Sequence, residues 1–213
     1  MYLENPKKYS MLVEQAHQVA LNVLRPISRK YDKAEHEYPK ELDMLASLLD
    51  GMNEGSPNGA GATSATGGSS NSNTSEIKNG ANLSTVMGII EMCWGDVGLL
   101  LAMPRQGLGN AAIAAVANEE QLERFKGTWA AMAITEPNCG SDSAAIRTTA
   151  TKDGDDYILN GEKIYVTSGA RADSVVVWAT LDKNIGRAAI KSFVVKHGTP
   201  GMEIARLEKK LGI

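Results

Sequence analysis

Met132-Ala133-Ile134-Thr135-Glu136-Pro137-Asn138-Cys139-Gly140-Ser141-Asp142 is the stretch at which the pattern of the chain changes. Before it, apolar residues recur at helical spacing, and after it they alternate as they do in strands. Within the stretch an apolar strand runs into Thr-Glu-Pro. Proline has no N–H and cannot continue a strand ladder. We therefore expect the chain to leave its sheet at Pro137 and to enter a polar loop.

The residues before this stretch predict a helical domain over residues 1–128. Four helices are predicted, over residues 7–31, 39–50, 83–103 and 106–126. Pro26 should kink or end the first of them, because a proline inside a helix removes a hydrogen bond. The segment 51–82 is rich in glycine and serine, and we interpret it as a flexible linker or surface insertion without chemistry of its own.

The residues after the stretch predict a β domain over residues 129–213. Asp153-Gly154 and Asn160-Gly161 are typical of tight hairpin turns. Strand patterns occur at residues 157–159, 163–167, 174–180, 192–195 and 202–207. Thr199-Pro200-Gly201 is a predicted turn. Successive hairpins favour a small barrel or sandwich. The predicted fold class is therefore α+β, an all-α N-terminal domain followed by an antiparallel β-barrel or sandwich domain.

The composition narrows the classes of function. The 213 residues carry a net charge of -3, so nucleic acid is not an expected partner. The most apolar region, 83–117, is interrupted by charges and a proline, and it lacks the roughly 20 uninterrupted apolar residues of a membrane span. No apolar signal core follows the N-terminal lysines. Cys93 and Cys139 match no metal-ligand spacing, so we expect reduced thiols, a cytoplasmic protein and no metal site.

The strand end and its loop have the chemistry of a cofactor site. Ile134 offers apolar surface and Thr135 a hydroxyl, which together suit a flat ring with a polar edge, such as a flavin. Gly140 can adopt positive φ and turn neighbouring N–H groups toward an anion, and Ser141 adds a hydroxyl donor. The alternative is an ordinary strand-to-loop turn, which this stretch alone does not exclude.

Tyr165-Val166-Thr167 is the second candidate for ring binding. Alternation along a strand would place Tyr165 and Thr167 on one face, where an aromatic ring and a hydroxyl would cover a flavin and bond its edge. The alternative is a half-exposed strand with two residues that favour β structure. The sequence shows no Ser-His-Asp or Cys-His set.

In their order along the chain, these segments resemble the acyl-CoA dehydrogenase family. Residues 132–142 are similar to the first signature of that family. Asn160-Gly161-Glu162-Lys163-Ile164-Tyr165-Val166-Thr167-Ser168-Gly169 is similar to the segment that follows it in the family. Thr199-Pro200-Gly201 and Lys210-Leu211-Gly212-Ile213 match later landmarks in the same order. Four ordered matches are far more specific than any one of them.

The resemblance implies an FAD-dependent oxidoreductase that removes the α and β hydrogens of an acyl-CoA thioester, with hydride transfer to flavin N5. The residues it implies for FAD binding are Met132, Ile134, Thr135, Gly140, Ser141, Tyr165, Val166 and Thr167. Within this set, Gly140 and Ser141 would lie near the pyrophosphate, and Ser141 would also lie near the substrate. Thr167 would bond the N5 edge, where a donor stabilises the reduced ring.

The resemblance also implies what this chain lacks. We expect the family's C-terminal helical domain, which carries the proton-abstracting glutamate, to be absent, so no catalytic residue is predicted. Glu136 lies inside the cofactor motif and would be a poor substitute. An electron-transfer flavoprotein is the expected electron acceptor, and a homo-oligomer is expected if the C-terminal domain is present. The alternatives are an acyl-CoA oxidase-like flavoenzyme and a non-catalytic fragment or subunit that needs a partner chain.

Overall fold

The computed structural model describes residues 7–53, 81–104 and 108–211. They form two compact units, each described here by itself. A helical unit extends to Pro104 and includes the residues from Lys209 onward, and a second unit comprises Arg105–Glu208. The predicted α+β class, helices followed by a sheet, is confirmed. Of the segment 51–82, only 51–53 and 81–82 are described, and they belong to helices; residues 54–80 lie outside the described part.

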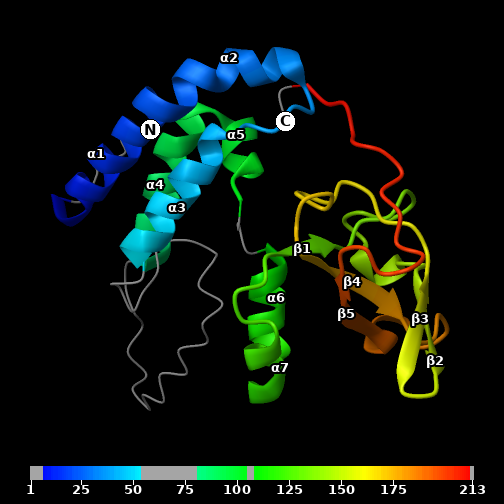
Figure 1. Ribbon diagram of the computed structural model, residues 1–213. Coiled ribbons are helices and arrows are strands. Elements are labelled where there is room, and N and C mark those ends of the chain that lie inside the picture. Colours follow the sequence, from blue (N-terminus) through cyan, green and yellow to red (C-terminus); the bar gives the residue numbers. More distant parts are fainter. Residues whose placement is uncertain (1–6, 54–80, 105–107, 212–213) are drawn as a thin grey trace. The chain divides into compact units, whose positions relative to one another are not determined.

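The first predicted helix continues from Lys7 to Ala34 (blue in Figure 1). Its parts are η1 (Lys7–Tyr9), α1 (Ser10–Val19), the π-helical turn η2 (Ala20–Leu24) and α2 (Arg25–Ala34). The helix does not end at Pro26, which lies in the first turn of α2. In the wider turn before it, the Arg25 N–H donates to the Ala20 carbonyl, five residues back. A π turn of this kind accommodates a proline without breaking the helix.

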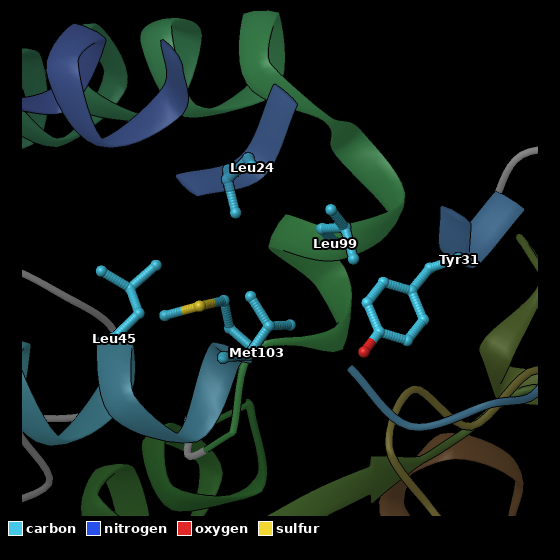
Figure 2. Close-up of a cluster of buried hydrophobic side chains, with 6 residues drawn as sticks. Leu24, Tyr31, Leu45, Leu99 and Met103 are labelled. Atoms are coloured by element: carbon cyan, nitrogen blue, oxygen red, sulfur yellow. The ribbon is translucent and has the colours of Figure 1, made fainter. Parts of the chain in front are cut away.

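Three further helices complete the helical unit: α3 (Glu41–Asn53), α4 (Ala81–Gly95) and α5 (Val97–Ala102). Residues 83–103, predicted as one helix, are thus divided at Asp96, whose backbone is extended and whose carboxylate caps α5 by accepting from the Leu99 N–H at 2.7 Å. The core of this unit consists of Leu24, Tyr31, Leu42, Leu45, Leu99 and Met103 (Figure 2). Leu24 and Leu42 are fully buried, so each contributes about 1.5–3 kcal/mol of hydrophobic stabilisation.

The second unit is built on one five-stranded sheet (Figure 1). Its strands are β1 (Ala130–Ala133), β2 (Thr149–Asp153), β3 (Asp156–Asn160), β4 (Ser174–Thr180) and β5 (Ile190–Lys196). Two short 3-10 helices, η3 (Ser143–Ala145) and η4 (Gly186–Ala189), lie between strands.

The sheet is mixed, which corrects the prediction of a purely antiparallel domain. β4 lies at its centre and pairs antiparallel with β5 along its whole length. On its other edge, β4 pairs parallel with β1 and, at the single pair Thr149 and Thr180, with β2. The β2–β3 hairpin predicted at Asp153-Gly154 is confirmed. Residues 202–207 form no strand, whereas the predicted turn at Thr199-Pro200-Gly201 is present.

Two helices of the second unit precede β1: α6 (Leu108–Val116) and α7 (Glu119–Arg124). In α6, Ile113 packs with Ala130 and Val176 of the sheet. The approach is so close that a Cβ on Gly109 would lie 2.3 Å from the Ala131 carbonyl oxygen. By contact, the helices α6 and α7 belong with the sheet. The domain boundary at 128/129 concerns the family architecture and stays a prediction.

No helix in residues 7–53, 81–104 and 108–211 is both long and apolar enough to cross a bilayer. Cys93 and Cys139 are free thiols.

Candidate functional site

The chain leaves the sheet after β1 in a tight turn over residues 136–139. The Glu136 N–H donates to the Cys139 carbonyl at 3.0 Å, and the Cys139 N–H donates back to the Glu136 carbonyl at 3.1 Å. Pro137 and Asn138 lie between them and are exposed. β1 ends at Ala133, so the chain leaves the sheet before the predicted point at Pro137. The turn points the Glu136 side chain into the protein, where 6% of the residue is exposed.

The carboxylate of Glu136 is the centre of a buried polar cluster. It accepts hydrogen bonds from the backbone N–H groups of Arg147 at 2.6 Å and Thr148 at 2.9 Å, and from the Thr148 hydroxyl at 2.5 Å. The ammonium of Lys163 lies 2.8 Å from the same carboxylate. Burial raises the pKa of Glu136, but the hydrogen bonds from Lys163, Thr148 and Arg147 outweigh it and hold the pKa at about 2. At neutral pH, Glu136 therefore carries a negative charge that is fully partnered.

Lys163 joins this cluster to the end of β1. Its ammonium also donates to the Ile134 carbonyl at 2.9 Å, and the side chain is only 9% exposed. The next residue, Ile164, donates its backbone N–H to the Thr135 carbonyl at 2.9 Å. The two segments that the sequence marks as candidates, 132–142 and 160–169, are thus in direct contact through these bonds.

Residues 163–167 do not form the predicted strand, and Asn160-Gly161 is not a hairpin turn. The backbone of Tyr165 has φ 55° and that of Ser168 has φ 59°, values that no strand contains. Tyr165 and Thr167 therefore do not share a strand face. The physical reason is tertiary: Gly161 packs so closely on Thr148 that a Cβ there would lie 2.3 Å from the Thr148 hydroxyl, and Lys163 is buried against Glu136.

The predicted ring-binding residues of this segment have different surroundings. Tyr165 is 60% exposed. Val166 packs against a buried cluster formed by Ala131, Ala133, Ala172 and Val175. Thr167 is half-buried and lines a shallow hollow that is open to solvent. The other described residues that line this hollow are Leu108, Trp129, Ala130, Ala131 and Ser168.

Around β1, the predicted residues lie at or near the surface. Met132, Ile134 and Thr135 are half-buried, and Gly140 and Ser141 are exposed. Within the described part of the chain, the backbone N–H groups of Gly140 and Ser141 donate no hydrogen bond. Gly140 does not have the positive φ expected from the sequence. The reciprocal bonds between Glu136 and Cys139 already close the turn, so no left-handed residue is needed there.

Sequence reasoning missed the polar cluster and most of the hollow. Glu136 and Lys163 were visible only as parts of a motif, and a charged residue gives no sequence signal that it is buried. Thr148 lies in a stretch without any marked pattern. Trp129, the residue before β1, was the one available signal for the hollow, since aromatic residues often line binding surfaces.

The sheet unit is also recognisable by comparison with known proteins. A profile of the family described as acyl-CoA dehydrogenase, middle domain, matches residues 131–213. By this match, residues 131–213 are a middle domain of the acyl-CoA dehydrogenase family. The family resemblance inferred from the sequence motifs is therefore confirmed. The middle-domain match begins inside β1 and includes both segments of the candidate site.

Named proteins match different lengths of the chain. Cyclohex-1-ene-1-carbonyl-CoA dehydrogenase from Geobacter metallireducens is 44% identical over 98 residues, 45% of this chain and 26% of that protein. Acryloyl-CoA reductase (NADH) from Anaerotignum propionicum is 31% identical over 97% of this chain and 50% of its own length. The structure of butyryl-CoA dehydrogenase from Megasphaera elsdenii aligns with a TM-score of 0.68 at 27% identity, covering 94% of this chain and 51% of that one. The chain spans about half the length, or less, of these relatives.

Proposed function

We propose that the sheet unit forms the flavin-binding side of an FAD-dependent acyl-CoA dehydrogenase site. The observation that carries the proposal is the direct bonding of the two family motifs, through Ile164 to Thr135 and through Lys163 to Ile134. This arrangement brings the ends of two irregular segments to one edge of the sheet. It is supported by the family match over residues 131–213.

The residues present fit an FAD molecule in two respects. The shallow hollow is lined by two hydroxyl-bearing residues, Thr167 and Ser168, and by the apolar residues Leu108 and Trp129, which are the residue types that the edge of a flavin ring requires. The exposed N–H groups of Gly140 and Ser141, with the Ser141 hydroxyl, offer donors for a pyrophosphate. We therefore retain the eight predicted cofactor residues as the proposed FAD contacts, and Ser141 as a proposed substrate contact.

The proposed reaction is the α,β-dehydrogenation of an acyl-CoA thioester. Bound FAD would supply the hydride acceptor, at N5 of the ring. The chain's own residues would hold and orient the cofactor, with the Thr167 hydroxyl donating to the ring edge. Glu136 is not the base that takes the α-proton, since its carboxylate is buried and already accepts hydrogen bonds from Arg147, Thr148 and Lys163. The base would come from protein beyond the described residues.

The direction of electron flow has a second candidate. The relative that aligns over 97% of this chain is a reductase, acryloyl-CoA reductase (NADH), so a site of this kind in the present protein could saturate a C=C bond beside a thioester. An electron-transfer flavoprotein remains the proposed electron acceptor for the dehydrogenase direction, with O₂ for an oxidase-like variant. A homo-oligomer and a cytoplasmic location also remain proposals, the latter in keeping with two free thiols.

The test is to purify the chain, saturate it with FAD, remove free cofactor and record the visible spectrum. A retained flavin spectrum is expected. Anaerobic addition of a saturated acyl-CoA to the protein that also contains the family's C-terminal domain should bleach this spectrum, and reoxidation by an enoyl-CoA should restore it. A protein that retains no FAD in either form would overturn the proposal. Retention without bleaching would leave a non-catalytic flavin-binding subunit.

A further inference from the structure

We propose that the buried ion pair of Glu136 and Lys163 is a positioning device that holds the Thr135 and Thr167 segments in the geometry that binds the cofactor. The inference rests on the proposed function. It goes beyond it because neither residue is among the proposed FAD contacts: both act through their neighbours.

The first step is that the two segments share no strand ladder. β1 ends at Ala133, and residues 161–169 contain no strand. Their alignment therefore depends on individual bonds. Two of these pass through the Lys163 ammonium, to the Ile134 carbonyl at 2.9 Å and to the Glu136 carboxylate at 2.8 Å. The bond from Ile164 to Thr135 follows directly in the chain.

The second step is that the segment after Lys163 is strained. Tyr165 and Ser168, which flank Val166 and Thr167, both have positive φ although neither is glycine. Such residues persist only where the surrounding structure enforces them. Lys163 lies two residues before the first strained position, and Val166 is packed against the core cluster beside β1. The Lys163 anchor and this packing together fix where the Thr167 hydroxyl points.

The third step is that both residues of the ion pair are held in place by the surrounding protein. Lys163 is 9% exposed and Glu136 is 6% exposed. Glu136 is itself held by the N–H groups of Arg147 and Thr148, which begin the approach to β2. Removing one partner leaves an uncompensated buried charge, whereas removing both charges relieves it. Stability and positioning can therefore be separated by experiment.

The experiment compares Lys163→Met, the double variant Glu136→Gln with Lys163→Met, and Lys152→Met as a control at an exposed position on β2. Three quantities are measured for each variant. FAD affinity is measured by titration, the free energy of unfolding is measured in urea, and protection of the Ile164 amide is measured by hydrogen exchange. The double variant should recover unfolding free energy relative to Lys163→Met. Its FAD affinity should stay about tenfold or more below that of the wild type, as for a lost buried hydrogen bond. Exchange at Ile164 should be faster, and Lys152→Met should match the wild type throughout.

A double variant that binds FAD and protects Ile164 like the wild type would overturn the positioning role. The positioning role would also be overturned if the FAD affinity of the double variant recovered together with its stability. That result is expected if the ion pair only stabilises the fold. If FAD binds neither to the wild-type chain nor to the protein with the family's C-terminal domain, the proposed function fails. The Ile164 amide then tests the positioning role by itself: faster exchange in the folded double variant supports that role, and unchanged exchange contradicts it.

Discussion

At the scale of single residues, Glu136 has its role decided by its surroundings. In the sequence it is one carboxylate in a cofactor-like motif, but in the structure it is buried and bonded to Thr148, Arg147 and Lys163. A carboxylate with this many donors is stable as an anion and has no reason to take a proton from a substrate. This is the physical reason for excluding it as the catalytic base.

The pKa of Glu136 predicts a pH dependence of stability. In the folded protein, the pKa of Glu136 is about 2, below its ordinary value of 4.5. The ionised carboxylate therefore stabilises the folded state in full above about pH 5. This stabilisation is lost as the pH falls from 4.5 to 2, by about 3 kcal/mol in total. Urea unfolding of the wild type and of Glu136→Gln is measured between pH 7 and pH 2.5. The difference between their free energies of unfolding should become smaller as the pH falls below 4.5. Parallel curves for the two proteins would contradict the assignment. Glu41, also with a pKa of about 2, affects both proteins equally.

Thr167 provides the most direct test of the proposed FAD site. Thr167→Val keeps the shape of the side chain and removes the hydroxyl that we propose for the flavin edge. We expect FAD binding to weaken, or flavin reduction to slow, by about 1–3 kcal/mol, because a buried polar edge loses its partner. The measurement is FAD titration followed by the rate of anaerobic bleaching. Thr149→Val, at a half-buried threonine of β2, is the matched control. Equal affinity and rate in the two variants would remove Thr167 from the ring edge.

At the scale of elements, caps and close contacts explain why helices end where they do. Asp96 divides the apolar run into α4 and α5, since its carboxylate accepts from the Leu99 N–H and from the Ser28 hydroxyl of α2. The hydrophobic pattern alone continues through this point and predicts one helix. The division lets α5 turn Leu99 into the core cluster with Tyr31 and Met103 (Figure 2).

The cap at Asp96 can be tested by replacement. Asp96→Ala should destabilise the helical unit by about 1–2 kcal/mol, because the first turn of α5 loses its acceptor. Asp96→Asn should retain most of the stability, since asparagine is an equally good N-cap. The two variants are compared by urea unfolding followed by circular dichroism. If Asn costs as much as Ala, the charge of Asp96 matters more than its capping geometry.

At the scale of the whole molecule, the chain consists of two compact units, each with its own core. In each unit, a helix glycine permits a close approach to a neighbouring element. A Cβ on Gly95 of α4 would lie 2.9 Å from the Cβ of Ala20, and one on Gly109 of α6 would lie 2.3 Å from a β1 carbonyl oxygen. By contrast, a Cβ on Gly88 of α4 would meet only Leu12, at an ordinary 3.6 Å.

These glycines allow the independence of the units to be tested. Gly95→Ala and Gly109→Ala should each cost about 1–3 kcal/mol through overpacking. Native-state hydrogen exchange, read by peptide, should show the loss only in helical-unit peptides for the first and only in sheet-unit peptides for the second. Gly88→Ala is the control and should leave α4 as stable as before or slightly more so. Loss of protection in both units from either variant would mean that they unfold together.

Local signals in the sequence were enough to determine several features of this protein. Helical periodicity, the Asp153-Gly154 turn and the apolar runs of β4 and β5 each act over a few neighbours, and they were enough to predict that these elements exist. The helical pattern did not predict the breaks at Asp96 and Asn118, which divide the segments 83–103 and 106–126 into two helices each. The ordered motifs were enough to identify the acyl-CoA dehydrogenase family, because they carry its specific residues.

Only the tertiary structure decided the mixed pairing around β4, the irregular path of residues 161–169 and the burial of Glu136 with Lys163. Tyr165-Val166-Thr167 has good strand propensity, yet the packing of Gly161 on Thr148 and the ion pair of Lys163 hold the segment in another conformation. These contacts join residues 13 and 27 positions apart in the chain (161 − 148 and 163 − 136). Local propensity contains no information about such partners, and their combined energy exceeds the weak preference of three residues for a strand.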